Sequence, residues 1–230
     1  MRVKICGLTQ ADQALAIVHQ GATDLGFICV SQSPRYVAPP QIADILKALE
    51  ADGWQGGTVG VFANTEVETI HAVVQQTGLN TVQIHGAETL EQCQHLRQAL
   101  PQHRLIKAIR VRATADLDQA LTYLPTVDAL LLDAYHPDHL GGTGLTLDWF
   151  ALQSFAPPCP WFLAGGLRPD NIQTALASLR PDGIDLSSGV ELRPGVKDLA
   201  LVQALFDRLR EMEDASQFQE WSGIRTSMGG

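Results

Sequence analysis

Residues 2–30, RVKICGLTQADQALAIVHQGATDLGFICV, contain a short apolar run, a stretch with helical spacing and a second apolar run. The two apolar runs, residues 2–6 and 24–30, have the length and the β-branched content of strands. The segment between them begins near Thr9, which can cap a helix, and reaches Gly21, where a helix should stop. This order predicts two parallel strands joined by a right-handed helical crossover.

The same unit recurs along the chain, which predicts an α/β fold with eight parallel strands. Apolar runs such as DLGFICV and DALLLD suit strands that are buried on both faces. Eight repeats favour a single closed (β/α)8 TIM barrel over residues 1–212. A doubly wound open sheet is the alternative, but no G-x-G-x-x-G follows the first strand. The remaining strands are expected at residues 58–63, 81–85, 104–111, 128–133, 161–165 and 183–187. The helices are expected to begin near Thr9, Pro39, Thr65, Ala87, Thr114, Leu147, Pro169 and Lys197. Of these residues, Thr9, Thr65 and Thr114 can cap a helix.

The C-terminal segment, residues 213–230, shows no clear periodicity, so we expect a short, mobile extension there. No run approaches the roughly 20 apolar residues of a membrane helix, and the N-terminus lacks a signal peptide. Four cysteines without a C-x-x-C pair suit a reducing compartment. These features predict a cytoplasmic protein without a membrane partner.

The formal net charge of −9 argues against a nucleic-acid partner. It leaves room for a small phosphorylated ligand, since backbone N–H groups can bind a phosphate without lysine or arginine. His136 and His139 resemble a metal pair, but only Asp138 lies near them in the sequence. We therefore expect neither a metal nor a cofactor.

In a barrel of this type the chemistry lies at the C-terminal ends of the strands. Cys6, His85 and Asp133 end the first, fourth and sixth predicted strands, and Arg35 follows the second. Each also has an ordinary structural interpretation: a buried inert thiol, a hydrogen-bonded strand end, a loop-capping carboxylate and a solvated arginine. Asp185 and Ser187 share one face of the eighth strand.

Two glycine-rich loops follow the last two strands, where this fold commonly holds a phosphate. They contain Gly165 and Gly166 after the seventh strand, and Ser188 and Gly189 after the eighth. Small residues there let a ligand approach the backbone. The alternative is that these glycines only form tight turns.

Seven motifs stand in order from residue 4 to about residue 211: KICG, SPRYV, VGVF, QIHG, LLLD…GGTG…LDW, AGGLRPDN and DLSSGVE…PGVKD. Together they resemble the phosphoribosylanthranilate isomerase family of tryptophan biosynthesis. The resemblance implies an Amadori rearrangement of N-(5'-phosphoribosyl)anthranilate by general acid and base catalysis. It also implies a protein that is a monomer or a homodimer.

The resemblance assigns Cys6 as the base, Asp133 as the acid and Arg35 as the clamp for the substrate carboxylate. Cysteine and aspartic acid ordinarily have pKa values of about 8.5 and 3.9. At neutral pH these values leave the cysteine protonated and the aspartate ionised, whereas a base must be deprotonated and an acid protonated. Lys4 shares a strand face with Cys6, where it would either favour the thiolate or pair with Asp185. The other substrate-binding residues that the resemblance implies are His85, Gly142, Gly165, Gly166, Asp185, Ser187, Ser188 and Gly189.

Three other functions compete with this one. A sister barrel of histidine biosynthesis performs the same rearrangement with an aspartate in place of Cys6. Indole-glycerol-phosphate synthase relies on lysine and glutamate at strand ends, a combination that this chain lacks. A non-catalytic phosphoribosyl-binding barrel is the third. Leu145 and Arg193 depart from the family pattern, but neither is the proposed acid or base.

Overall fold

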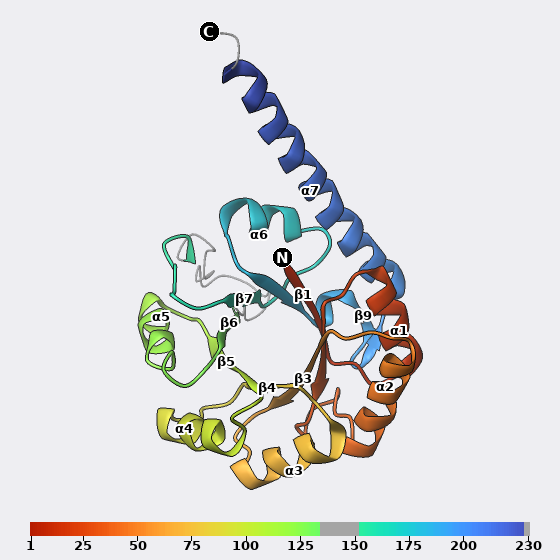
Figure 1. Ribbon diagram of the computed structural model, residues 1–230, viewed down its shortest axis with the longest axis vertical. Helices are drawn as coiled ribbons and strands as arrows, with labels where there is room; N and C mark the ends of the chain where they lie inside the picture. Colours follow the sequence, from red (N-terminus) through yellow and green to blue (C-terminus); the bar gives the residue numbers. More distant parts are fainter. Residues whose placement is uncertain (134–151, 228–230) are drawn as a thin grey trace, which may run out of the picture.

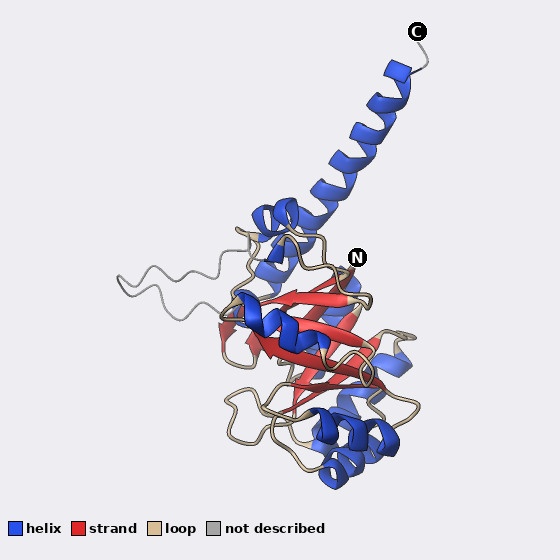
Figure 2. Ribbon diagram, turned by 90° about the vertical axis from the view of Figure 1, so that its left-hand side faces the viewer, coloured by secondary structure: helices blue, strands red, loops and turns tan. Residues whose placement is uncertain are grey.

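A computed structural model describes residues 1–133 and 152–227, with side chains described as far as residue 214. Eight parallel strands form a closed barrel in chain order, and the last strand pairs with the first. Helices surround this barrel on its outer side (Figures 1 and 2). The predicted (β/α)8 barrel is therefore confirmed. The strands are β1 (Arg2–Cys6), β2 (Asp24–Ile28), β3 (Gly57–Phe62), β4 (Thr81–Ile84), β5 (Arg104–Arg110), β6 (Ala129–Asp133), β7 (Trp161–Ala164) and β8 (Gly183–Leu186).

Seven α-helices occur in the described part of the chain, and each start lies within three residues of the expected one. The eighth expected helix, near Leu147, lies outside the described residues. None of the described helices combines the length and apolar character that a bilayer crossing requires. The helices are α1 (Ala11–Gln20), α2 (Pro39–Ala51), α3 (Val67–Thr77), α4 (Leu90–Ala99), α5 (Thr114–Leu121), α6 (Ile172–Ser178) and α7 (Leu199–Ser227).

The threonine caps predicted for three helices are wrong. The capping positions of α1, α3 and α5 are Gln10, Glu66 and Ala113, one residue away from the expected threonines. The hydroxyl of Thr9 instead donates to the carbonyl of Gly195, 2.7 Å away. An N-cap is decided by which residue leaves the helical φ and ψ region, and a nearby threonine does not decide that.

The core has two layers because strand side chains alternate between the inside of the barrel and its helix-facing side. The outer layer lies between strands and helices and is the larger apolar cluster. The inner layer also contains two buried charges, Lys4 and Asp185. Its apolar side chains are Cys6, Val59, Val61, Ile106, Ala108, Ala129, Leu131, Phe162 and Ala164.

Helix α7 covers one side of the barrel and then leaves it (Figures 1 and 2). Its first half packs against α1 and α6 and buries Val202, Leu205 and Phe206. The helix passes the boundary expected at residue 212 and continues to Ser227. Apolar residues recur with the helical period where one face of a helix packs against a core, so a helix that leaves the barrel surface shows little of that pattern in its sequence. The mobility expected for residues 213–230 stays a prediction.

Candidate active site

Cys6 ends β1 inside the mouth of the barrel, with 5% of its surface exposed. The neighbouring residue of β2, Gly26, leaves room for the thiol, because a Cβ at that position would lie 2.6 Å from Sγ. Beneath the thiol, Lys4 Nζ donates to Asp185 Oδ2 at 2.9 Å and to Gln83 Oε1 at 2.7 Å. Lys4 is thus paired with Asp185, and its ammonium group also acts on Cys6, so the two arrangements that the sequence offered occur together.

The charges around Cys6 oppose one another. Burial raises the pKa of the Cys6 thiol, while the ammonium groups of Lys4 and Lys197 lower it without cancelling the effect of burial. Burial lowers the pKa of Lys4 itself, but Asp185 and Cys6 outweigh that effect and raise it. Lys4 therefore favours the thiolate, but burial outweighs it, and the pKa of Cys6 lies above its ordinary value.

Asp133 ends β6, three strands from β1 in the closed order, with 19% of its side chain exposed. Its Oδ2 lies 3.4 Å from Nε2 of His85, which follows β4. The other ring nitrogen of His85, Nδ1, lies 3.1 Å from Gln83 Nε2. Since Gln83 also accepts from Lys4, polar contacts run from Asp133 to the group beside Cys6. The predicted acid and base thus face the same end of the barrel.

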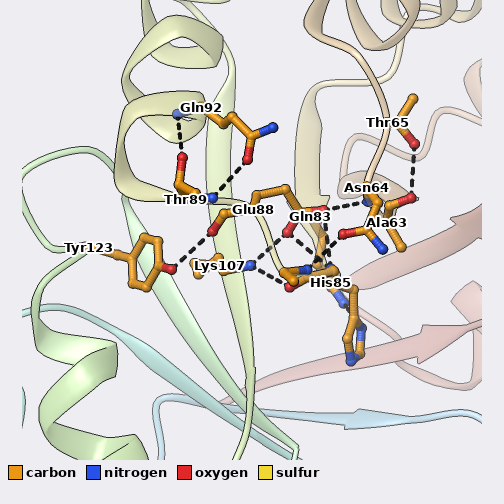
Figure 3. A network of polar contacts seen from close by, with 12 residues as sticks. Ala63, Asn64, Thr65, Gln83, His85, Glu88, Thr89, Gln92, Lys107 and Tyr123 are labelled. Carbon is orange, nitrogen blue, oxygen red and sulfur yellow. Dashed lines mark hydrogen bonds and ion pairs between the residues drawn. The ribbon is translucent and has the colours of Figure 1, made fainter.

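A buried ion pair holds the loop that carries His85 (Figure 3). Glu88 Oε2 accepts from Lys107 Nζ at 2.6 Å, and Glu88 Oε1 accepts from the backbone N–H of Asn64 at 2.7 Å. The same carboxylate accepts from the N–H of Gly86, and Lys107 donates to the carbonyl of Gly86 at 2.9 Å. Both the N–H and the carbonyl of Gly86, the residue after His85, are therefore hydrogen-bonded.

Close backbone packing reinforces this loop. Asn64 has a φ of 51°, and its Oδ1 accepts from the N–H of Ala87 at 2.8 Å. A Cβ at Gly86 would lie 2.4 Å from that Oδ1, so only glycine fits. Sequence reasoning missed the Glu88–Lys107 pair. A lysine inside the apolar run RLIKAIR was the available signal, because a buried lysine requires a partner.

Arg35, in the loop after β2, is not a solvated loop arginine. Its Nε lies 3.0 Å from both carboxylate oxygens of Glu191, and its Nη2 donates to Oε2 at 2.7 Å. Its aliphatic stem lies against Gly7, where a Cβ would be 2.8 Å from Arg35 Cδ. Arg35 therefore sits beside the end of β1, and Glu191 is a second residue that the sequence did not reveal.

The loops after β7 and β8 lie against each other. Gly165 and Gly166 have φ values of 92° and 63°, which favour glycine. After β8, a short 3₁₀ turn spans Ser188–Val190. A Cβ at Gly189 would lie 1.9 Å from the carbonyl oxygen of Leu167, so the two backbones meet there.

Ser187 follows β8, the strand that pairs with β1, and its Oγ lies near Gly7 in the loop after β1. Of the predicted site residues, the structure thus gathers Cys6, Asp185 and Ser187 with Arg35, and it joins His85 to Asp133. Gly142 lies outside the described residues, as do Leu145, His136 and His139.

Comparisons with known proteins agree with this geometry. The sequence model described as N-(5'-phosphoribosyl)anthranilate (PRA) isomerase matches residues 3–208. The N-(5'-phosphoribosyl)anthranilate isomerase of Synechococcus elongatus is 56% identical over 209 residues, which is 91% of this chain and 96% of that protein. The chain belongs to the N-(5'-phosphoribosyl)anthranilate isomerase family.

Solved structures of this isomerase family share the fold. The phosphoribosyl anthranilate isomerase of Thermotoga maritima superposes with a TM-score of 0.79 at 35% identity, covering 92% of this chain and 99% of that one. Another structure of the isomerase, in complex with reduced 1-(o-carboxyphenylamino)-1-deoxyribulose 5-phosphate, has a TM-score of 0.77 at 33% identity, with the same coverage. A further structure describes monomers generated from the dimeric T. maritima isomerase; its TM-score is 0.77 at 32% identity, and it covers 92% and 99% of the two chains.

Proposed function

We propose that Cys6 and Asp133 carry out the two proton transfers by which this aldose–ketose isomerase of tryptophan biosynthesis acts. The substrate is N-(5'-phosphoribosyl)anthranilate, and the product is 1-(2-carboxyphenylamino)-1-deoxyribulose 5-phosphate. The observation that carries the proposal is the run of contacts from Asp133 through His85 and Gln83 to Lys4, beside Cys6. It supports a common site for an acid and a base that come from distant strands.

The first transfer opens the sugar ring. Asp133, acting as the acid, gives a proton to the furanose ring oxygen as the C1'–O bond breaks, and the lone pair of the aniline nitrogen forms the C1'=N bond of a protonated Schiff base. The ring oxygen becomes a hydroxyl group. His85 lies 3.4 Å from the carboxyl of Asp133, where it can orient that carboxyl toward the ring oxygen.

The second transfer removes the proton from C2'. The Cys6 thiolate takes this proton, and the electron pair of the C–H bond moves into the Schiff base to form an enolamine that tautomerises to the ketone. The thiolate must form in a buried place, where burial raises the pKa of Cys6. The ammonium groups of Lys4 and Lys197 stabilise the thiolate electrostatically.

The remaining polar groups suit the rest of the substrate. Arg35 holds the anthranilate carboxylate, since a guanidinium matches a carboxylate in two parallel hydrogen bonds. Asp185 Oδ1, buried without a hydrogen-bond partner among the described residues, accepts from a ribose hydroxyl. The phosphate binds the loops that carry Gly165, Gly166, Ser187, Ser188 and Gly189, where small residues let an anion approach the backbone N–H groups.

Consumption of phosphoribosylanthranilate, followed as loss of its fluorescence, tests this function. The purified chain is expected to consume it with turnover and without added metal or cofactor. Binding without consumption would support a phosphoribosyl-binding barrel instead. Faster conversion of the aminoaldose of histidine biosynthesis would support the sister isomerase.

Two further properties belong to the proposal. We expect a monomer or a homodimer, and the T. maritima relative described as dimeric supports the second. Sedimentation equilibrium distinguishes the two states. We also expect a cytoplasmic protein, which the four free cysteines support. Cell fractionation checks the location.

A further inference from the structure

We propose that Glu191 is a positioning residue that turns one edge of the Arg35 guanidinium toward the bound substrate and thereby sets the preference for a substrate that carries a carboxylate. This inference rests on the proposed role of Arg35. It concerns a residue that does not itself touch the substrate.

The hydrogen bonds of Arg35 identify the edge that is free. A guanidinium offers two edges with paired N–H groups, one formed by Nε and Nη2 and the other by Nη1 and Nη2. Glu191 occupies the Nε edge, with contacts of 3.0 Å to Nε and 2.7 Å to Nη2. No hydrogen bond of Nη1 occurs within the described residues, and 24% of the side chain is exposed. The edge that contains Nη1 is therefore open to a ligand.

Glu191 is itself held firmly. Only 3% of its side chain is exposed, and its Oε1 accepts from Lys197 Nζ at 2.8 Å and from the N–H of Gly195 at 3.3 Å. Lys197 also donates to the carbonyl of Ser187, at the end of β8. Lys197 and Gly195 lie on and beside the strand pair β9 (Glu191–Arg193) and β10 (Val196–Lys197). The carboxylate thus links Arg35 to this separate two-stranded sheet and, through Lys197, to the segment that follows β8.

The charges of this cluster also favour an anionic ligand. Arg35 and Lys197 carry two positive charges and Glu191 one negative charge, so the three groups have a net charge of +1. Arg35 is close enough to Cys6 for the two to interact electrostatically. A carboxylate bound at the open edge would therefore place its substrate next to the proposed base.

Without Glu191, the long Arg35 side chain would sample several rotamers, and its free edge would no longer point one way. The loss should then affect substrates that carry a carboxylate and spare those that lack it. A purely structural role for Glu191 would affect both kinds of substrate equally. The carboxylate of the substrate is therefore the variable that separates the two roles.

The experiment compares N-(5'-phosphoribosyl)anthranilate with N-(5'-phosphoribosyl)aniline, which lacks the carboxylate. In Glu191→Gln we expect kcat/KM for the anthranilate substrate to fall about 10-fold or more, mainly through KM, and the value for the aniline analogue to stay within about twofold. Equal losses for both substrates would overturn the inference. If Glu191→Gln does not fold, Glu191→Asp serves in the same comparison, because it withdraws the carboxylate by one methylene and keeps its charge.

Arg35→Met separates this inference from the proposed role of Arg35. If Arg35 is the clamp, Arg35→Met removes the preference for the anthranilate substrate, and adding Glu191→Gln to it reduces that preference no further. If Arg35→Met keeps the preference, Arg35 is not the clamp and both ideas fail. If Arg35→Met removes the preference for the anthranilate substrate but Glu191→Gln retains it, Arg35 is the clamp and the positioning role of Glu191 fails.

Discussion

Lys4 Nζ lies 2.9 Å from Asp185 Oδ2, and both groups are buried inside the barrel beneath Cys6. Burying an ion pair costs desolvation energy, and removing one of the two partners leaves the charge of the other buried and uncompensated. The pair also supports the chemistry, since the ammonium group stabilises the Cys6 thiolate. Stability and activity therefore depend on the same lysine.

Replacement of Lys4 by methionine tests this dependence. Lys4→Met leaves Asp185 buried without its partner, so we expect a loss of about 3–5 kcal/mol in the free energy of unfolding. Urea unfolding measures the change. The double variant Lys4→Met/Asp185→Leu is the matched control, because it removes both charges and should recover much of the stability. A loss below about 1 kcal/mol in the single variant would contradict the account.

The pH dependence of the reactivity of Cys6 follows from the surroundings of its thiol. Burial raises the pKa of Cys6, so the thiolate that acts as base becomes more abundant as the pH rises above neutrality. We expect the rate at which iodoacetamide alkylates Cys6, a measure that does not require the proton of Asp133, to rise with pH until that pKa is passed. Lys197→Met removes a charge that lowers the pKa of Cys6, and the rising limb should then move to higher pH. A wild-type profile that levels off below neutral pH would contradict this assignment.

Glu88 gives a prediction for acid stability. Burial raises its pKa, but Lys107 and the backbone amide of Asn64 outweigh that effect, and the net pKa is lowered. The stability from this lowered pKa is therefore present above the ordinary glutamate pKa of about 4.3 and is lost as the pH falls through the folded value. We expect Glu88→Gln to cost about 3–5 kcal/mol of unfolding free energy at neutral pH, because it leaves Lys107 buried without its partner.

Chemical unfolding at a series of pH values measures this effect. The difference in unfolding free energy between wild type and Glu88→Gln should shrink as the pH falls from about 5 to 3. Glu91→Gln, on the exposed first turn of α4, is the matched control and should change stability by less than about 0.5 kcal/mol. A constant difference at every pH would show that the stabilisation does not depend on the charge of Glu88.

The sequence was sufficient to predict the barrel and the strand-end candidates. Parallel strands in a closed sheet must all end on one side, so apolar runs that end in Cys6 and Asp133 bring both residues to the same face. Partners of buried charges were harder to predict. Glu191 pairs with Arg35 across 156 positions of sequence, and that pairing depends on a hairpin whose placement no local pattern encodes. Only the burial of Lys107 hinted at Glu88.

Turnover of two single variants tests the central claim most directly, with Cys29→Ala as the control. Cys29 donates to the carbonyl of Phe27, and burial raises its pKa to about 12, so it should tolerate replacement with little change in kcat. The account predicts that Cys6→Ala and Asp133→Asn each lower kcat for phosphoribosylanthranilate by about 10²–10⁴-fold while the protein stays folded. Near-wild-type turnover in either variant would contradict it.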